Sequence, residues 1–374
     1  MNTLGLYIHI PFCRSKCLYC DFCSFPRAED SSMNAYADEL CRRLIACAPR
    51  AADRVVKTVY FGGGTPTILP LLAFESILQT ISTHYMLSDD CEITAECNPA
   101  TADFAYLSAL RALGVNRLSI GLQSVHENEL RALGRAHTYA EFETVFSDAR
   151  RAGFENISVD LMYGIPEQTE ESFGASIEKL CALAPEHISS YGLKIEEGTP
   201  FFRMQNTLSL PDEDTEYRMY CLLTHELQKH AYHKYEISNF AKNGRHSRHN
   251  LRYWKGEEYL GFGVAAHSYF EGVRFGNSRD IDAFLRGEDI VCERAVISAH
   301  EREEERVMLG LRLTEGISLE DFATQTGVRF EERYPIVRRM IDGGFMKMEN
   351  EHISFTDKGF FVSNAILAQM LSFD

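Results

Sequence analysis

Segments with strand and helix patterns alternate along the first half of the chain, and this alternation limits the available folds more than any other feature. Short runs rich in apolar and β-branched residues predict six strands, at residues 6–10, 55–61, 92–96, 117–122, 157–162 and 187–193. Helical periodicity predicts helices between them, at 34–47, 72–84, 104–113, 128–133, 140–152 and 171–183. Alternating strands and helices build a parallel sheet. We therefore expect an α/β fold, either a full or partial (β/α) barrel or an open sheet.

The regular pattern ends after a further helix predicted at 216–229. Residues 235–269 contain several His, Arg and Gly residues and show neither a helical nor a strand period. From residue 298 the sequence predicts a helix opened by the capping pattern at Ser318, a second helix over 331–341 that contains Pro335, and a hairpin over 345–356. This order resembles a winged helix, and because it lacks a concentrated basic face we favour an interaction or lid role over DNA binding. We divide the chain into a barrel core (1–235), a connecting region (236–297) and a C-terminal α+β winged-helix-like domain (298–374).

Three cysteines follow the first predicted strand at the spacing C-x₃-C-x₂-C: Cys13, Cys17 and Cys20. A structural zinc site uses four protein ligands, and an ordinary [4Fe–4S] cluster uses four cysteines. No second pair of zinc-type ligands follows at a matching interval, and a thioredoxin-type pair leaves Cys13 unexplained. The spacing therefore favours a cluster with one iron open to a ligand that is not protein. We interpret Cys23, three residues after Cys20, as incidental.

Composition narrows the function classes. The formal charge of −16 over 374 residues argues against sequence-independent nucleic-acid binding, which depends on basic side chains. No apolar run is long enough to cross a membrane, and the N-terminus lacks the pattern of a secretory signal. Most of the eleven cysteines are scattered, which is typical of buried thiols in a reducing compartment. These features predict a cytoplasmic protein.

Polar residues occur where several predicted strands end. Gly63, Gly64 and Thr65 come directly after the second strand, where glycines let the backbone approach a ligand closely. Glu96, Gln123 and Asp160 lie at the ends of later strands or within them, and Arg135 lies between two helices. The mouth of a barrel is formed by the carboxyl ends of its strands. A ligand that carries both an ammonium and a carboxylate would suit this mixture of charges.

The cysteine loop and these polar residues resemble the radical S-adenosylmethionine (SAM) superfamily. Its signature has the spacing C-x₃-C-x₂-C with an aromatic residue before the third cysteine, which is Tyr19 here. The resemblance implies a partial (β/α)6 radical-SAM barrel and a [4Fe–4S] cluster on the three cysteines. It also implies that SAM chelates the open iron and is cleaved after one-electron reduction.

Within that superfamily, the chain is similar to the oxygen-independent coproporphyrinogen III dehydrogenase group over nearly its whole length. The segments YIHIPFC, FGGGTPT, ECNP, GLQS, VDLMYGIP, YEISNFA and HNLRYW carry this similarity. It implies SAM contacts at the following positions: Tyr7, Tyr19, Gly63, Gly64, Thr65, Glu96, Gln123, Arg135, Asp160, Lys194 and His267.

Two departures point to the HemW-like haem chaperone branch of this group. Only twelve residues precede Cys13, whereas the dehydrogenases carry an N-terminal extension, and Phe22 occupies the position of their further cysteine. The branch also carries H-N-x-x-Y-W, which is His249–Trp254 here and contains the single tryptophan.

The HNLRYW segment can be interpreted as a haem contact. His249 could ligate iron, with His246 as a competing ligand, while Tyr253 and Trp254 offer flat apolar surfaces. Nearby arginines could pair with the propionates: Arg245, Arg248 and Arg252. The alternative is a structural loop whose tryptophan packs in the core.

The sequence therefore predicts a haem chaperone that binds a [4Fe–4S] cluster, SAM and haem and passes haem to an apo-haemoprotein, which can be membrane-associated. A flavodoxin or ferredoxin would be its reductant, a homodimer its assembly, and nucleic acid is not an expected partner. One alternative is an oxygen-independent coproporphyrinogen III dehydrogenase. Another is an interaction or redox-sensing protein whose cluster performs no catalysis.

Overall fold

A twelve-stranded sheet forms the frame of the molecule in the computed structural model, which describes residues 2–26 and 28–371. Six consecutive strands of this sheet are parallel and correspond to the six predicted strands. They are β1 (Asn2–Ile10), β4 (Arg54–Gly63), β5 (Met86–Cys97), β6 (Arg117–Gln123), β7 (Ile157–Tyr163) and β8 (His187–Gly192). Strand β8 pairs with an antiparallel strand rather than with β1, so the barrel is partial. The predicted α/β fold is confirmed in this form.

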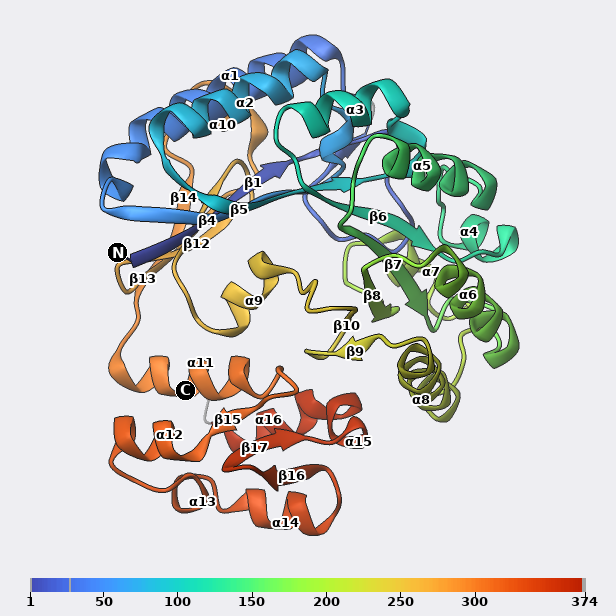
Figure 1. Ribbon diagram of the computed structural model, residues 1–374, viewed down its shortest axis with the longest axis vertical. Helices are drawn as coiled ribbons and strands as arrows, with labels where there is room; N and C mark the ends of the chain where they lie inside the picture. Colours follow the sequence, from blue (N-terminus) through green and yellow to red (C-terminus); the bar gives the residue numbers. More distant parts are fainter. Residues whose placement is uncertain (1, 27, 372–374) are drawn as a thin grey trace.

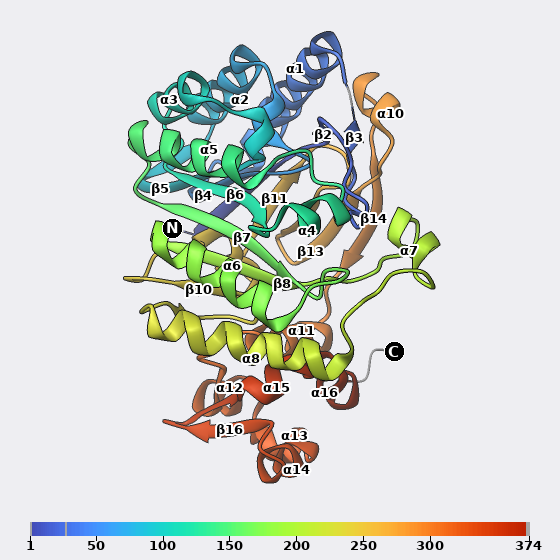
Figure 2. The same ribbon diagram turned by 90° about the vertical axis from the view of Figure 1, so that its right-hand side faces the viewer.

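Helices cover the outer face of the parallel strands, as Figures 1 and 2 show. Helix α5 shows why these helices form and pack on the sheet. Thr138 begins it with a capping box, and its apolar residues recur at helical spacing on one buried face. That face consists of Phe142, Val145, Phe146 and Ala149. The covering helices are α1 (Asp30–Cys47), α2 (Leu71–His84), α3 (Phe104–Ala112), α4 (Glu127–Ala132), α5 (Tyr139–Arg151), α6 (Glu170–Leu183) and α8 (Glu213–Lys229).

The segment 235–269, in which the sequence shows no period, contains a short helix and short strands that the sequence did not predict. Its elements are β10 (Asn239–Ala241), α9 (Arg248–Trp254), β11 (Tyr259–Phe262) and β12 (His267–Phe270). Each is only three to seven residues long, and β10, α9 and β11 are held by partners distant in sequence. Strand β11 pairs in parallel with β1, and β10 pairs antiparallel with β8. Strands β9 (His233–Lys234), β13 (Val273–Asn277) and β14 (Val291–Val296) complete the sheet.

Helix α9 lies on the open side of the curved sheet, inside the incomplete barrel (Figure 1). The Glu92 carboxylate in β5 accepts the backbone N–H groups of Arg248 (3.2 Å) and His249 (3.1 Å). An anion at the first N–H groups of a helix satisfies donors that have no partner within the helix. This contact fixes the HNLRYW segment against the strands, because its acceptor belongs to the barrel itself.

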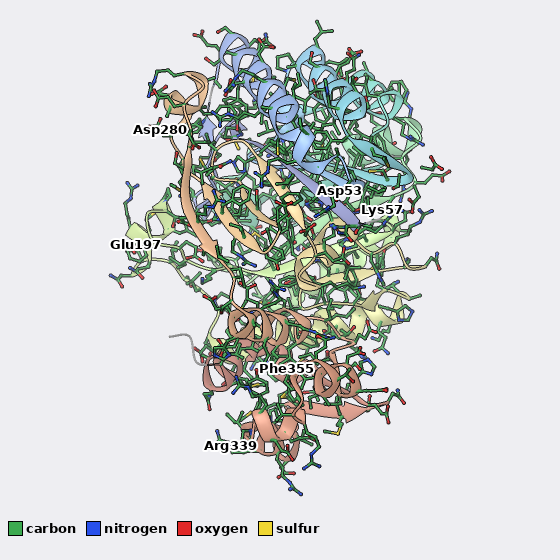
Figure 3. The ribbon with its side chains drawn as sticks, turned by 90° about the vertical axis from the view of Figure 1, so that its left-hand side faces the viewer. Asp53, Lys57, Glu197, Asp280, Arg339 and Phe355 are labelled. Carbon is green, nitrogen blue, oxygen red and sulfur yellow. The ribbon has the colours of Figure 1, made fainter. Side chains whose placement is uncertain are left out.

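The C-terminal part has its own hydrophobic core, which joins the barrel through Tyr220 of α8. It contains the three-stranded sheet β15–β17–β16, and Figure 3 shows Phe355 of β17 within it while Arg339 points outward. Its elements are α11 (Ala299–Gly310), β15 (Ile317–Ser318), α12 (Leu319–Thr326), α13 (Phe330–Arg333), α14 (Ile336–Asp342), β16 (Met346–Glu349), β17 (His352–Phe355), α15 (Asp357–Phe361) and α16 (Ser363–Met370).

The single helix predicted over 331–341 is two helices, because proline interrupts it. Tyr334 leaves the helical region at φ −125° and ψ 75°, as the ring of the following Pro335 requires. The Ser318 side chain caps α12 by accepting the N–H of Asp321, and the predicted hairpin forms between β16 and β17. No helix among residues 2–26 and 28–371 is both long and apolar enough to span a membrane.

Candidate functional site

The three spaced cysteines lie on a loop that emerges from the carboxyl end of β1. Two short strands, β2 (Phe12–Cys13) and β3 (Phe25–Pro26), pair in parallel and bring the ends of the loop together. Leu18 anchors the middle of the loop by donating its N–H to Leu133 and accepting the N–H of Phe201, each at 3.0 Å. The loop is thus held over the mouth of the barrel by backbone hydrogen bonds, and its thiols are free and partly exposed.

The donor set on this loop suits a cluster better than a single ion. No group of three or more His, Cys, Asp or Glu among the described residues converges as a single metal ion would require. A cubane cluster instead attaches each cysteine to a separate iron. Burial raises the pKa of Cys13, and it raises the pKa of Cys20 to about 11. Bound metal is what stabilises the thiolate form of such cysteines.

The glycine loop after β4 packs directly against the cysteine loop. Gly64 and Thr65 donate their N–H groups to the carbonyls of Ile10 (2.8 Å) and Phe12 (2.7 Å). A Cβ atom on Gly64 would lie 2.6 Å from the Phe12 carbonyl oxygen, and Gly63 has a φ of 111°. Glycine is therefore required at both positions, by close approach at one and by backbone conformation at the other.

Two half-buried carboxyl groups line the cavity beside the glycine loop. Glu96 accepts the Tyr60 hydroxyl (2.9 Å) and the Gly63 N–H (3.2 Å), and Asp160 accepts the Ser119 hydroxyl (3.2 Å). Burial raises the pKa of Glu96 to about 7, with the Asp160 carboxylate contributing in the same direction. Burial likewise raises the pKa of Asp160. A cationic ligand would relieve the cost of ionising both groups.

Arg135 and Gln123 complete this side of the site. Arg135 donates to the Gly121 carbonyl at 2.8 Å and lies 3.5 Å from the Cys17 sulfur, while its Nε is buried without a partner among the described residues. Gln123 has a φ of 71° at an irregularity in the β6–β7 pairing. Strained backbone of this kind is concentrated at ligand sites.

One cavity brings together most of the predicted site. It is lined by the three cysteines and by eight of the predicted SAM contacts: Tyr19, Gly63, Gly64, Thr65, Glu96, Gln123, Arg135 and Asp160. We call it the cysteine cavity. Tyr7 and His267 instead line a neighbouring cavity that adjoins at Gly63 and Glu96. Lys194 lines a third cavity inside the barrel, which we call the inner cavity.

Phe22 and Cys23 follow the cluster loop and occupy different environments. Cys23 is buried and lines the cavity of Tyr7 and His267 rather than the cysteine cavity. Its carbonyl lies 3.0 Å from Nε2 of His9. Phe22 is 64% exposed and lines all three cavities. An exposed aromatic ring at this junction is available to an apolar ligand.

The structure places the predicted haem ligand His249 inside the barrel at 1% exposure. Its Nδ1 lies 2.8 Å from the Thr58 hydroxyl, and its Nε2 lies 2.8 Å from the Tyr253 hydroxyl. The ring stacks on Tyr60 at a centroid distance of 5.2 Å, and burial lowers the pKa of His249 to about 3. The imidazole is thus neutral, as an iron ligand must be, but one of its hydrogen bonds must break before it binds metal.

The other polar residues predicted for haem lie away from the cavities of the cluster loop: Arg245, His246 and Arg248 line one separate cavity, and Arg252 is buried elsewhere. His246 stacks on Tyr235 and lines a separate cavity with Glu92 and Arg245. Arg248 pairs with Asp90. Arg252 is buried and donates to the carbonyls of Thr3 and Glu258. Of the three arginines, Arg248 and Arg252 are therefore already engaged by protein groups.

Sequence reasoning missed the polar inner layer of the barrel. Alternate residues of the buried strands carry it: Thr58, Tyr60, Glu92, Thr94, Arg117, Ser119, Ser158, His187, Ser189 and Tyr191. The available signal was the period of two in polar residues within otherwise apolar strands, such as Arg117 and Ser119 in RLSIGLQ. A polar barrel interior leaves room for a ligand beyond the mouth.

Comparison with known proteins agrees with this geometry. The model of the radical SAM superfamily matches residues 7–180, and that of the HemN C-terminal domain matches residues 297–362. The chain is 34% identical to heme chaperone HemW of Bacillus subtilis, over 98% of both chains. It is 32% identical to heme chaperone HemW of Escherichia coli, over 100% of this chain and 99% of the relative.

The chain belongs to the HemW family. Among solved structures it is similar to coproporphyrinogen III oxidase (HemN) of Escherichia coli, with a TM-score of 0.85 at 22% identity over 98% of this chain and 89% of the other. This likeness shows that the HemW family member has the same fold. Its radical SAM domain implies a [4Fe–4S] cluster and SAM. The free thiols, the carboxyls of Glu96 and Asp160, and the Arg135 Nε, which has no partner among the described residues, fit these groups.

Proposed function

We propose that this protein is a haem chaperone that holds a [4Fe–4S] cluster and SAM, binds haem and transfers it to an apo-haemoprotein. The observation that carries the proposal is that three free cysteines and eight predicted SAM contacts line one cavity in a chain of the HemW family. Relatives named as haem chaperones cover almost the entire chain, which supports the same function for the whole protein.

Each group of residues has a defined task in this proposal. Cys13, Cys17 and Cys20 hold the cluster, which when bound supplies the electron that cleaves SAM. Glu96 and Asp160 suit the ammonium of SAM because they are half-buried carboxyl groups that form no ion pair among the described residues, although the charge of Arg117 acts on both. The Arg135 guanidinium offers an unused N–H to an anionic or polar group of the ligand.

Haem is proposed to bind beside this site rather than to replace SAM within it. Phe22, Tyr253 and Tyr259 provide aromatic surface along the cavity that adjoins the cysteine cavity. His249 remains the predicted iron ligand, and its Tyr253 partner lies on the same cavity wall. Ligation would therefore require the His249 ring to exchange the Tyr253 hydroxyl for iron.

The partners follow from the same proposal. Arg14 and Lys16 are exposed on the cluster loop, so a flavodoxin or ferredoxin could dock there and deliver electrons over a short path. The recipient of haem would be an apo-haemoprotein. A membrane-associated acceptor, homodimer formation and a cytoplasmic location stay predictions.

Anaerobic reconstitution tests the proposal. We expect the reconstituted protein to bind haem and to load an apo-haemoprotein without converting coproporphyrinogen III. Decarboxylation of coproporphyrinogen at enzymatic rates would instead support the dehydrogenase alternative. A complete cluster with neither SAM nor haem binding would support the interaction or redox-sensing alternative.

A further inference from the structure

Arg117 is a buried arginine whose guanidinium is not paired. It is the first residue of β6 and is 2% exposed, and its Nε is buried without a hydrogen-bond partner among the described residues. Other buried or half-buried arginines of the protein have partners: Arg252 donates to backbone carbonyls, and Arg150 of the outer helix α5 pairs with Glu186. A buried charge without a partner is costly, so its presence indicates a group that the protein alone does not provide.

The side chain lines the inner cavity. Tyr60, Met162 and Tyr191 give this cavity apolar surface. Its polar surface comes from Ser189 and Asn250 and from four acidic residues: Asp21, Glu96, Asp160 and Glu196. It adjoins the cysteine cavity at Glu96, Ser119 and Asp160, but Arg117 belongs to the inner cavity alone. Tyr191 is 43% exposed and Lys194 is exposed, so the inner cavity is open where β8 ends.

The groups around Arg117 are committed to other contacts. Glu96 accepts from Tyr60 and Gly63, and Asp160 accepts from Ser119. The charge of Arg117 opposes the rise in the pKa of both carboxyls, but among the described residues neither lies within ion-pair distance of the guanidinium. The two nearby imidazoles are also used. His187 bonds Ser158 and Tyr235, and His249 bonds Thr58 and Tyr253. What Arg117 lacks is therefore an anion that enters from the cavity.

We infer that Arg117 binds a carboxylate of a second ligand that reaches into the inner cavity beside SAM, and that this carboxylate is a propionate of the haem bound along the adjoining cavity of Tyr7 and His267, which shares Phe22 and Glu96 with the inner cavity. An arginine and a carboxylate form a charge-assisted, often bidentate pair, and the aromatic walls suit the apolar body of a tetrapyrrole. The choice of haem rests on the proposed function. The methionine carboxylate of SAM is the other source of the same chemistry, and the experiment separates the two.

The test compares Arg117→Met with Arg150→Met, whose arginine lies outside the barrel paired with Glu186. Each variant is titrated with haem, with the bis-amide of haem, in which both propionates are uncharged, and with S-adenosylhomocysteine. We expect Arg117→Met to weaken haem binding roughly 10- to 100-fold, the value of a charged hydrogen bond, and to leave bis-amide binding unchanged. Arg150→Met should match the wild type with all three ligands.

A thermal melt of the ligand-free protein excludes a purely structural role. Replacing an unpaired buried charge with an apolar side chain of similar length should raise the Tm of Arg117→Met. A lower Tm would show that Arg117 stabilises the fold itself and would overturn the inference.

The binding outcomes distinguish a failure of the Arg117 carboxylate site from a failure of the proposed chaperone function. Equal haem affinity in the wild type and Arg117→Met, or equal losses for haem and its bis-amide, would overturn the inference while leaving the chaperone function intact. A selective loss of S-adenosylhomocysteine binding would assign the carboxylate to SAM and overturn the assignment to haem. If the wild type bound no haem at all, the proposed function would be wrong, and unchanged S-adenosylhomocysteine binding in Arg117→Met would then reject the carboxylate site as well.

Discussion

The Nε2 atom of His249 lies 2.8 Å from the hydroxyl of Tyr253, one turn further along α9, so the histidine and the tyrosine of the HNLRYW segment are hydrogen-bonded to each other. The second ring nitrogen is bonded to Thr58. The HNLRYW motif, whose sequence suggests an exposed haem contact, therefore has both ring nitrogens of its histidine hydrogen-bonded within the protein. Iron ligation by His249 requires this network to open.

Removing the Tyr253 hydroxyl should make His249 more available. If His249 ligates iron, Tyr253→Phe should bind haem several-fold more tightly than the wild type, and His249→Ala should lose the ligand signature in the haem absorption spectrum. Tyr259→Phe is the matched control, because Tyr259 packs against Tyr253 without bonding His249. Weaker haem binding in Tyr253→Phe would show that the phenol, rather than the imidazole, makes the contact.

Cluster ligation should depend on three cysteines and not on the fourth. Cys13→Ser, Cys17→Ser and Cys20→Ser should each lose most of the iron bound after anaerobic reconstitution, because a cluster held by two cysteines is not retained. Cys23→Ser should keep the wild-type iron content, since Cys23 lines a different cavity. Iron and sulfide analysis with the absorption spectrum measures both. A full cluster in Cys13→Ser would contradict the ligand assignment.

Close packing at the glycine loop predicts that an added side chain at Gly64 lowers the free energy of unfolding. Gly64→Ala places a Cβ 2.6 Å from a backbone oxygen, so we expect a loss of about 1–3 kcal/mol in unfolding free energy. Gly174→Ala is the control: Gly174 lies within α6, where an added Cβ would come no closer than 3.5 Å to Leu222. There alanine should stabilise the helix by about 0.5–1 kcal/mol. Urea unfolding of the two variants should therefore move in opposite directions.

The raised pKa of Glu96, about 7, predicts how ligand binding depends on pH. A cationic ligand binds the ionised carboxylate, so the affinity for S-adenosylhomocysteine should rise as the pH increases from about 5.5 to 7 and then level off. Glu96→Gln should flatten this rise. Without ligand the sign is reversed: the unfolded chain ionises Glu96 at lower pH, so the folded protein loses stability as the pH rises from about 4.5 through 7. Calorimetric titration at several pH values measures the affinity. An affinity for S-adenosylhomocysteine that falls between about pH 5.5 and 7 would contradict the role of Glu96.

The sequence predicted those parts of the fold that have a strong local period. Each parallel strand contains a short run rich in apolar and β-branched residues, followed by turn residues, and the sequence predicts all six from this pattern. Helix α9 was missed because its position depends on Glu92 and Thr58, residues more than 150 positions away. Pro335 shows the opposite situation. The residue before a proline avoids the helical conformation, so the sequence itself contains the signal that divides α13 from α14.

The residues of the site likewise divide into those with a local sequence signal and those that only the fold reveals. Residues in recognisable motifs, such as Gly64 at a strand end and Arg135 between two helices, could be named in advance, and they line one cavity in the structure. Arg117 could not, because one arginine at the start of an apolar strand has the appearance of a solvated strand end. Only its burial and its lack of a partner distinguish it.

The most direct test of the account is transfer of haem. The protein is reconstituted anaerobically with cluster and SAM, loaded with haem and mixed with an apo-haemoprotein, and the absorption spectrum of the recipient is followed over time. We predict that the recipient gains haem faster than from free haem at the same concentration and that added coproporphyrinogen III is not consumed. Conversion of coproporphyrinogen without transfer of haem would contradict the account.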